Sequence, residues 1–389
     1  MKMKVAILGS TGSIGGTTLE IIRKNKKDFS IDLLSTHKNI HKILKQAKEF
    51  KVKNIIVNSN SHFRKLKIIN KNKNLKIYNS FSSFKKIFKN KIDYTMCAIS
   101  GINGLKPTYD IIKYSKNIGI ANKESIICGW SLINKEIKKN KTNFIPIDSE
   151  HFSIWTLIKN DIHEINEIIL TASGGPFLNK SKKFINKVKP KDALNHPNWS
   201  MGQKISVDSA TMMNKVFETI EAKKIFNLDQ KKFKILIHPK SYIHAIVKYE
   251  NGLIKMLAHD TKMSIPIFNF LYHNRSNRIL TNPINLSILN NLSFSKPKFK
   301  NFPSLKVLSK IPKNETLFET ILISANEELV SSFLKNKIKF NDISHYLLQI
   351  IKIKELRKYI YKRPKNINEI LKTMKICKNL TNKFLKVND

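Results

Sequence analysis

Apolar and polar positions follow two rhythms along the first 150 residues of the chain. Short apolar runs such as Val5–Leu8 predict buried strands. Between them, apolar residues recur every three or four positions, a spacing that predicts amphipathic helices. Strands that alternate with helices predict an α/β fold with a doubly wound parallel sheet. The strands are expected at 5–9, 30–35, 54–57, 94–99, 118–121 and 144–147, and the helices at 17–24, 41–50 and 81–88.

The pattern changes beyond residue 150. An apolar run at Ile165–Leu170 predicts another strand, and Ser206–Phe226 has the spacing of one helix. Two more amphipathic helices are expected at Thr316–Leu334 and Ile343–Ile360. We therefore expect a Rossmann-like cofactor-binding domain, an α+β catalytic domain with a lid loop, a proline-bearing linker and a small helical domain, at residues 1–147, 148–288, 289–312 and 313–389.

The composition is that of a globular protein in a reducing compartment. Hydrophobic residues make up 41% of the 389 residues, enough for a sizeable core. The sequence has no run of about eighteen apolar residues, so we expect no transmembrane helix and no membrane partner. The N-terminus enters a strand too early for a secretory signal. Three cysteines, odd in number and far apart, argue against a disulfide framework and favour the cytoplasm of a bacterium.

The formal net charge of +43 invites a nucleic-acid-binding interpretation. Only six of the 71 basic residues are arginine, however, whereas base readout and bidentate phosphate contacts favour arginine. The excess is lysine, spread over the whole chain with asparagine and isoleucine, as in proteins encoded by AT-rich genomes. We therefore expect no nucleic-acid partner, although a basic surface attracts anionic small molecules.

A glycine-rich turn follows the first predicted strand. Gly9, Gly12 and Gly15 stand between a strand and a helical segment, as at the opening of dinucleotide-binding domains. Glycines let the backbone approach a pyrophosphate, which then meets the free N–H groups of the helix N-terminus. The second strand leads into His-Lys-Asn at 37–39, without the acid that usually holds the ribose of NAD. A cation there suits the 2′-phosphate of NADP, although Lys38 is equally explained as one more surface lysine.

Two carboxylates follow the last strand of this region. Asp148 and Glu150 come after the apolar run Ile145–Ile147, with Ser149 between them and His151 next in the chain. In an extended chain, residues two apart point to the same side, so both carboxylates can converge on one cation while Ser149 faces away. Hard divalent cations such as Mg²⁺ prefer oxygen ligands. The alternative is a strand end with two solvated acids.

Other polar residues lie in loops, where ligands of open sheets bind beyond the carboxyl ends of strands. The polar run 122–124 follows one predicted strand, and Ser173 follows another with two glycines that can form a nest for an anion. Trp199 and Met201 stand in a loop punctuated by glycine and proline. They fit a lid that closes over a substrate and excludes water, or a loop packed on the core.

The predicted helix at 206–226 carries a further polar cluster. Asn214 and Glu218 are four residues apart and share a face, with Lys215 within the same turn. Together with Ser209, these groups would suit a phosphate at one end and a metal at the other. Lys215 and Glu218 are equally explained as an ordinary surface pair.

These segments resemble the 1-deoxy-D-xylulose 5-phosphate reductoisomerase family, whose motifs they match in order across nearly the full length. The matching motifs are Gly9-Ser-Thr-Gly-Ser-Ile-Gly15, Ala121-Asn-Lys-Glu-Ser125, Asp148-Ser-Glu-His151, Ser173-Gly-Gly-Pro-Phe177, His196-Pro-Asn-Trp-Ser-Met-Gly202, Val207-Asp-Ser-Ala-Thr-Met-Met-Asn-Lys215, Ile237-His-Pro239 and Ala325-Asn-Glu327. The resemblance implies a homodimeric, NADPH-dependent enzyme of the non-mevalonate isoprenoid route. Such an enzyme rearranges 1-deoxy-D-xylulose 5-phosphate and reduces it to 2-C-methyl-D-erythritol 4-phosphate.

The resemblance also implies roles for individual residues. A divalent cation, Mg²⁺ or Mn²⁺ with Co²⁺ as a further option, is expected on Asp148, Glu150 and Glu218. These three carboxylates are expected to act in catalysis with Lys123 and His151, beneath a lid formed by Trp199 and Met201. The phosphosugar substrate is expected to contact Lys123, Ser149, Glu150, Ser173, His196, Ser209, Asn214, Lys215 and Glu218. NADPH is expected to contact Ser10, Thr11, Gly12, Ser13, Ile14, His37, Lys38, Asn39, Asn122, Glu124 and Gly202.

The chain departs from the family pattern at His37 and Val216, where glycine is common, and in residues 257–263, which are about one residue longer. None of these departures removes an expected metal or phosphate ligand. Two alternatives stay open. A plain sugar-phosphate dehydrogenase would not need three carboxylates for a metal, and a basic nucleic-acid-binding protein would bind duplex DNA and oxidise no NADPH.

Overall fold

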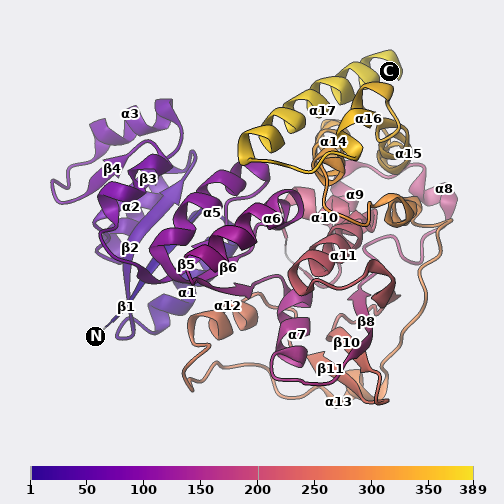
Figure 1. Ribbon diagram of the computed structural model, residues 1–389, viewed down its shortest axis with the longest axis horizontal. Coiled ribbons are helices and arrows are strands. Elements are labelled where there is room, and N and C mark those ends of the chain that lie inside the picture. Colours follow the sequence, from indigo (N-terminus) through magenta and orange to yellow (C-terminus); the bar gives the residue numbers. More distant parts are fainter. Residues whose placement is uncertain (1, 200, 389) are drawn as a thin grey trace. The chain divides into compact units, whose positions relative to one another are not determined.

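The computed structural model describes residues 2–199 and 201–388. The chain forms two compact units, each assembled from segments that are distant in the sequence (Figure 1). The first unit contains the chain up to Ile126 together with Ser131–Phe152 and Met263–Leu280. The second contains Ile127–Trp130, Ser153–Lys262 and the chain from Thr281 onward. The domain boundaries expected from the sequence stay predictions.

A seven-stranded parallel sheet forms the core of the first unit. Its order is β4-β3-β2-β1-β5-β6-β7. Strands β2 to β4 are added on one side of β1 and strands β5 to β7 on the other, as in doubly wound nucleotide-binding sheets. All four residues Val5–Leu8 of β1 are fully buried, which means that both faces of the sheet are covered. The predicted α/β fold is confirmed. The strands are β1 (Met3–Leu8), β2 (Phe29–Thr36), β3 (Asn54–Val57), β4 (Lys76–Tyr78), β5 (Ile92–Cys97), β6 (Ser115–Ile120) and β7 (Asn143–Pro146).

Helices connect these strands along the chain. A further helix of the first unit, α12, comes from much later in the sequence. This late helix, α12, packs against α1, and the hydroxyl of Tyr272 just beyond it donates to Asp28 at 2.7 Å. The helices are α1 (Ser13–Lys24), α2 (Ile40–Glu49), α3 (Asn60–Ile69), α4 (Phe84–Ile87), α5 (Leu105–Ile111), α6 (Lys123–Lys139) and α12 (Ser264–Leu271), with 3-10 turns η1 (Phe81–Ser83), η2 (Ile102–Gly104) and η3 (Ile112–Tyr114).

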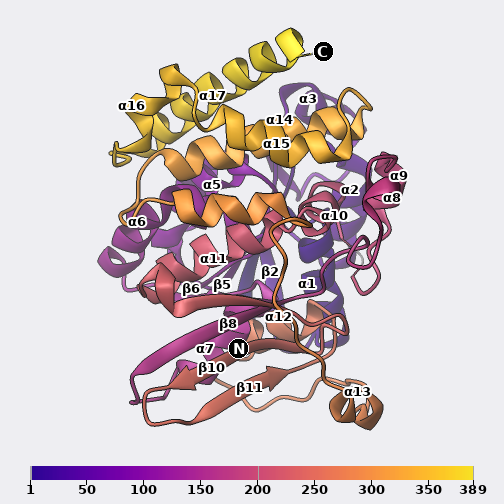
Figure 2. The same ribbon diagram turned by 90° about the vertical axis from the view of Figure 1, so that its right-hand side faces the viewer.

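The second unit is layered around a four-stranded mixed sheet of order β11-β10-β8-β9. Figure 2 shows α11 lying between this sheet and the C-terminal helices α14, α15 and α17. The strands are β8 (Ile165–Ala172), β9 (Phe233–Ile237), β10 (Ile243–Tyr249) and β11 (Ile254–Ala258). The helices are α7 (Ser149–Ile158, which starts in the first unit), α8 (Lys182–Ile185), α9 (Pro190–Leu194), α10 (Gln203–Ala210), α11 (Met213–Phe226), α13 (Leu286–Asn290), α14 (Phe318–Leu334), α15 (Phe340–Ile350), α16 (Arg357–Ile360) and α17 (Ile367–Asn388), with 3-10 segments η4 (Gln230–Lys232), η5 (Pro303–Lys310) and η6 (Lys354–Leu356).

The single helix predicted at Ser206–Phe226 is wrong, because the chain forms two helices there. The break falls at Met212, whose φ of 62° is left-handed and ends the helical hydrogen bonding. The hydroxyl of Thr211 donates to the carbonyls of Val207 and Asp208 at 3.2 Å, which tightens the last turn of α10. Among the described residues, no helix is both long and apolar enough to cross a membrane.

Candidate active site

The glycine-rich turn between β1 and α1 has the backbone geometry of a phosphate cradle. Gly9 has a φ of +85°, and a Cβ atom there would come within 2.6 Å of the Ala98 carbonyl oxygen. At Gly15, a Cβ atom would come within 2.4 Å of the Gly9 carbonyl oxygen. Glycine is therefore required at both positions. The N-cap of α1 is Gly12, which has no side chain to occupy the first-turn N–H groups.

Two hydroxyl residues of this turn are tied to the neighbouring β2 and α2. The buried Ser10 hydroxyl donates to Gln46 Oε1 at 2.8 Å, and the Thr11 hydroxyl lies 2.8 Å from that of Thr36. These bonds fix the turn at the carboxyl end of β1. The turn and the start of α1 contain five residues that are expected to contact the cofactor: Ser10, Thr11, Gly12, Ser13 and Ile14.

The loop after β2 contains the residues expected to select NADP. His37 Nδ1 lies 2.9 Å from the Asn58 carbonyl oxygen, and the Asn39 side chain caps α2 by accepting from the Lys42 backbone N–H at 3.1 Å. Lys38 is exposed. His37 and Asn39 therefore shape the loop that carries Lys38, the cation expected to bind the 2′-phosphate.

Asn122 joins two loops at the carboxyl ends of β5 and β6. Its Oδ1 caps α6 by accepting from the Ser125 backbone N–H at 2.7 Å. Its Nδ2 donates to the Gly101 carbonyl at 2.8 Å and to Glu124 at 3.3 Å. The structure thus gives Asn122 a positioning role within the first unit that the sequence pattern did not reveal.

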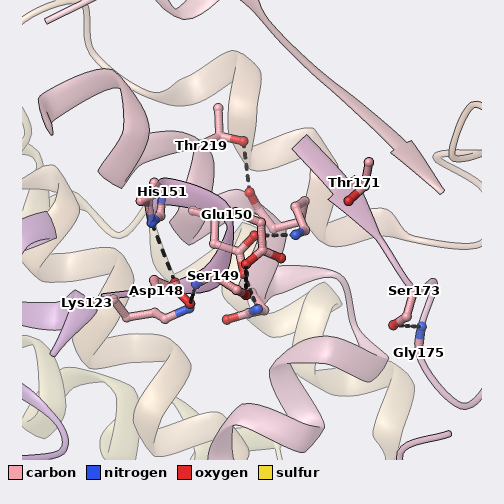
Figure 3. A network of polar contacts seen from close by, with 12 residues as sticks. Lys123, Asp148, Ser149, Glu150, His151, Thr171, Ser173, Gly175 and Thr219 are labelled. Carbon is pink, nitrogen blue, oxygen red and sulfur yellow. Dashed lines mark hydrogen bonds and ion pairs between the residues drawn. The ribbon is translucent and has the colours of Figure 1, made fainter. Parts of the chain in front are cut away.

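The acidic motif lies at the start of α7, where the structure gathers five polar side chains (Figure 3). Lys123 Nζ is 3.0 Å from Asp148 Oδ2, and His151 Nδ1 is 3.7 Å from the same oxygen. The Ser149 hydroxyl donates to Glu150 Oε2 at 2.6 Å. The expected extended geometry is wrong, because the helix begins at Ser149 and brings Ser149 and Glu150 into contact. Asp148 and Lys123 are nevertheless adjacent, with side chains 20% and 10% exposed.

Ser173 and His196 form one polar pair in the second unit. His196 Nε2 lies 3.0 Å from the Ser173 hydroxyl, while Nδ1 accepts from the backbone N–H groups of Asn198 and Trp199 at 3.2 and 3.0 Å. Because Nδ1 is an acceptor, the proton of the neutral ring is on Nε2. Burial lowers the pKa of His196, which favours this neutral form.

Consecutive glycines place the Ser173 loop directly on α10. Gly174 and Gly175 have φ angles of +82° and +69°, and a Cβ atom at Gly175 would come within 2.8 Å of the Ser209 carbonyl oxygen. The Gly175 N–H donates to the Ser173 hydroxyl at 3.1 Å (Figure 3). Two left-handed glycines therefore let the loop approach the C-terminal end of α10, whose N-cap is Gly202.

The structure places Asn214, Lys215 and Glu218 in contact on α11, with Lys215 and Glu218 buried. Asn214 Nδ2 donates to Glu218 Oε1, and Lys215 Nζ pairs with Glu218 Oε2. The side chains of Lys215 and Glu218 are only 5% and 1% exposed, so the pair is not an ordinary surface pair. Buried charges are stable only when they are paired and hydrogen-bonded, as these are.

The lid candidates occupy a loop that is anchored at several points. The Trp199 and His244 rings meet in an edge-to-face arrangement, with ring centroids 6.0 Å apart. Asn198 Nδ2 donates to the Ser241 hydroxyl at 3.0 Å. Trp199 and Met201 are each partly exposed, and residue 200 lies outside the described residues. Asn198 stands in the motif recognised from the sequence, but only the structure shows that it anchors the loop.

The doubly wound sheet, its glycine cradle and the second unit with its anion nest and buried Asn–Lys–Glu cluster define a dinucleotide-dependent enzyme of phosphorylated substrates. Family models give the same assignment. Residues 5–129 match 1-deoxy-D-xylulose 5-phosphate reductoisomerase, residues 144–226 match the C-terminal domain of that enzyme, and residues 259–380 match the DXP reductoisomerase C-terminal domain. The chain belongs to the 1-deoxy-D-xylulose 5-phosphate reductoisomerase family, as the sequence motifs predicted.

Individual relatives are similar over almost their whole length. The 1-deoxy-D-xylulose 5-phosphate reductoisomerase of Pelagibacter ubique (strain HTCC1062) is 56% identical over 370 residues, which cover 94% of this chain and 95% of that protein. The enzyme from Zymomonas mobilis in complex with NADPH has a TM-score of 0.89 at 29% identity, with 99% of each chain covered. A reductoisomerase structure with NADPH, fosmidomycin and magnesium has a TM-score of 0.93 at 33% identity, covering 99% of this chain and 98% of that one.

Proposed function

We propose that the chain converts 1-deoxy-D-xylulose 5-phosphate into 2-C-methyl-D-erythritol 4-phosphate, using NADPH and a divalent metal ion, in the non-mevalonate isoprenoid route. The observation that carries the proposal is family membership with every expected metal and phosphate ligand retained. The similar enzymes whose structures contain NADPH and magnesium support the same cofactors here. A plain dehydrogenase would leave the paired carboxylates after β7 without a role.

NADPH fits the carboxyl edge of the first sheet. The turn at Gly9 and Gly15 leaves room for a pyrophosphate, and the N-terminus of α1 supplies N–H donors. Lys38 provides the charge for the 2′-phosphate, on a loop held by His37 and Asn39. When bound, NADPH supplies the hydride that reduces the rearranged aldehyde.

A divalent cation, Mg²⁺ or Mn²⁺, suits the carboxylates of Asp148, Glu150 and Glu218, since hard cations take oxygen ligands. When bound, the cation supplies Lewis-acid polarisation of the substrate's carbonyl and hydroxyl oxygens. Lys123, 3.0 Å from Asp148, holds that carboxylate and can donate to a substrate oxygen. The hydroxyl of Ser149 is oriented by Glu150 at 2.6 Å and can donate likewise.

The substrate phosphate fits the second unit. Ser209 lies on α10 against the glycine nest, and Ser173 is hydrogen-bonded to the neutral His196 ring. Asn214 and the buried ammonium of Lys215 provide an amide donor and a positive charge on α11. Neutral hydrogen-bond donors and one cation suit a phosphate dianion, which accepts hydrogen bonds and has no proton to donate.

We also propose that the enzyme is a homodimer. Within the part of the chain that the structure describes, β11 pairs with β10 on one side only, so it is an edge strand. Leu253, Ile254 and Met256 on and beside it are 51%, 56% and 50% exposed. An exposed apolar edge strand is typical of a pairing surface. Light scattering coupled to gel filtration should give twice the monomer mass of 45.0 kDa.

A cytoplasmic location and the absence of a nucleic-acid partner are further parts of the proposal. Cys97, Cys128 and Cys377 are free and buried, as expected for thiols of a reducing compartment. If the positive charge served nucleic acid, duplex DNA would bind tightly and salt would weaken the binding steeply. We expect no such salt-dependent binding.

The deciding experiment follows NADPH absorbance with 1-deoxy-D-xylulose 5-phosphate and Mg²⁺. We expect oxidation of NADPH that stops with EDTA and returns with added Mg²⁺. Oxidation that is insensitive to EDTA would instead identify a plain sugar-phosphate dehydrogenase. No oxidation of NADPH under any of these conditions, together with tight binding to DNA, would overturn the assignment altogether.

A further inference from the structure

The turn between α10 and α11 is bonded to the C-terminal helix α14 through a buried carboxylate. Asp208, in the last turns of α10, is 1% exposed, and its Oδ1 accepts from Asn326 Nδ2 of α14 at 2.7 Å. Its Oδ2 pairs with Lys204 Nζ at 2.9 Å. Asn326 is fully buried. Both oxygens of a buried carboxylate therefore have fixed partners, which sets the position of this end of α10.

The turn itself is strained and is supported from outside. Met212 adopts the left-handed region at φ 62°, ψ 8°, which is unfavourable for a residue with a side chain. Such conformations persist where the surroundings determine them. One support is the Ser304 hydroxyl of η5, which donates to the Thr211 carbonyl. Asn326 on α14 is the second, through Asp208. Both supports come from distant parts of the chain, because the bonded residues are 93 and 118 positions apart in the sequence.

This turn separates the residues proposed to hold the substrate phosphate. Ser209 precedes it on α10, whereas Asn214 and Lys215 follow it in the first turn of α11. We propose that Asp208 and Asn326 are positioning residues, through which α14 holds the turn so that Ser209, Asn214 and Lys215 converge on one phosphate. The inference rests on the proposed function, because it assigns those three residues to the phosphate.

The chain offers a matched control at the far end of α11. Lys224, near the C-terminus of α11, is 7% exposed and pairs with Glu319 of α14 at 3.3 Å and with Glu315 at 3.2 Å. This contact also joins α11 to the α14 region through buried charge, but it lies almost three turns from the phosphate residues. A purely structural role for Asn326 predicts the same behaviour at both contacts.

The test compares three variants. They are the single variant Asn326→Asp, the double variant that combines Asp208→Asn with Asn326→Asp, and the control Lys224→Met. Asn326→Asp places a second carboxylate against that of Asp208, and the two repel each other. We therefore expect KM for 1-deoxy-D-xylulose 5-phosphate to rise by about tenfold or more, with KM for NADPH unchanged. The exchanged pair restores one donor and one acceptor and should recover most of that loss. Lys224→Met should lower the melting temperature at least as much and leave both KM values unchanged.

A second readout needs no turnover. Inorganic phosphate should raise the melting temperature of the wild type and of Lys224→Met, but not that of Asn326→Asp, in each case against chloride at equal ionic strength. Equal phosphate shifts in all variants would overturn the inference, as would a KM increase in Lys224→Met equal to that in Asn326→Asp. If the wild type turned over no substrate, the proposed function would fail, and the phosphate shifts would still decide the role of Asn326.

Discussion

At the scale of single residues, several expected ligands have a structural role as well. Asn39 was expected at the cofactor because of its place after β2, and its side chain also caps α2. Asn122 likewise stands in a recognised motif, and its amide joins the β5 and β6 loops. A sequence pattern identifies such residues without separating the two roles, because both use the same polar atoms. Substitutions at these positions must therefore preserve the cap.

The cofactor preference can be tested while the cap is kept. Replacing Lys38 by Ala and Asn39 by Asp removes the cation and adds a carboxylate for a ribose hydroxyl, while Asp still caps α2. We expect the ratio of kcat/KM for NADPH to that for NADH to fall by at least about tenfold. Lys71→Ala, which removes another exposed lysine of the first unit, should leave the ratio unchanged. A wild type that uses NADH equally well would refute the role of Lys38.

His196 gives a prediction of pH dependence. Burial lowers the pKa of its ring, so the folded protein resists a proton that the unfolded chain binds near pH 6.5. This group therefore leaves stability unaffected above about pH 6.5 and destabilises the fold increasingly as the pH falls below it. Protonation also removes the Nδ1 acceptor that holds Trp199.

The measurement is the melting temperature of the wild type and of His196→Gln across this acidic range. We expect the wild type to lose stability more steeply with falling pH than His196→Gln does. The matched control is His41→Gln, which removes an exposed histidine of α2. Parallel profiles for all three proteins would show that His196 titrates normally.

At the scale of elements, local signals account for the successes. Short apolar runs located β1 and β3, and the glycine spacing located the cradle. The extended geometry expected at Asp148 was wrong although a local signal for a helix was present, because Asp148 precedes an apolar helix with Glu150 in its first turn. The break at Met212 carried none, since methionine is no turn residue. One of its supports is the bond from the Ser304 hydroxyl to the carbonyl of Thr211, 93 residues earlier in the chain.

The lid loop is the element with the clearest kinetic prediction. The Trp199 ring meets His244 in an edge-to-face arrangement and remains partly exposed, so it contributes little to the core. We expect Trp199→Ala to lower turnover by about tenfold or more, because the loop clamps substrate and excludes water less well. The melting temperature should change by only a few degrees. Trp199→Phe, which keeps an aromatic ring beside His244, should retain more activity. A large loss of melting temperature with normal turnover would identify Trp199 as a core residue instead.

At the scale of the whole molecule, the three proposed metal ligands stand on segments that are far apart in the sequence. Asp148 and Glu150 directly follow β7, whereas Glu218 lies on α11. The resemblance of the sequence motifs to the family named all three, and their carboxylates supply the oxygen ligands that hard divalent cations prefer. Asn214 and Lys215, which contact Glu218, were also named from the sequence, but the burial of the Lys215–Glu218 pair was not predicted, since burial depends on how distant segments pack.

Glu218→Gln tests this metal site. The amide keeps the size of the side chain and an oxygen that can accept from Asn214, but it removes the charge that pairs with Lys215 and that would bind the metal. We expect weaker Mg²⁺ binding and turnover lowered by at least about a hundredfold, in line with the loss of several kcal/mol of Lewis-acid stabilisation. NADPH binding should survive, because the glycine cradle lies in the first unit.

Removal of a buried charge alone could also lower activity, so the control must remove an equivalent charge elsewhere. Glu319→Gln does so, because Glu319 is 1% exposed and pairs with Lys224 in the same unit. Calorimetric titration of Mg²⁺ with fosmidomycin present should show weakened binding in Glu218→Gln and wild-type binding in Glu319→Gln. Unchanged metal affinity in Glu218→Gln would remove Glu218 from the ligand set. Equal weakening in both variants would assign the effect to packing of the second unit, since Glu319 is not proposed to contact the metal.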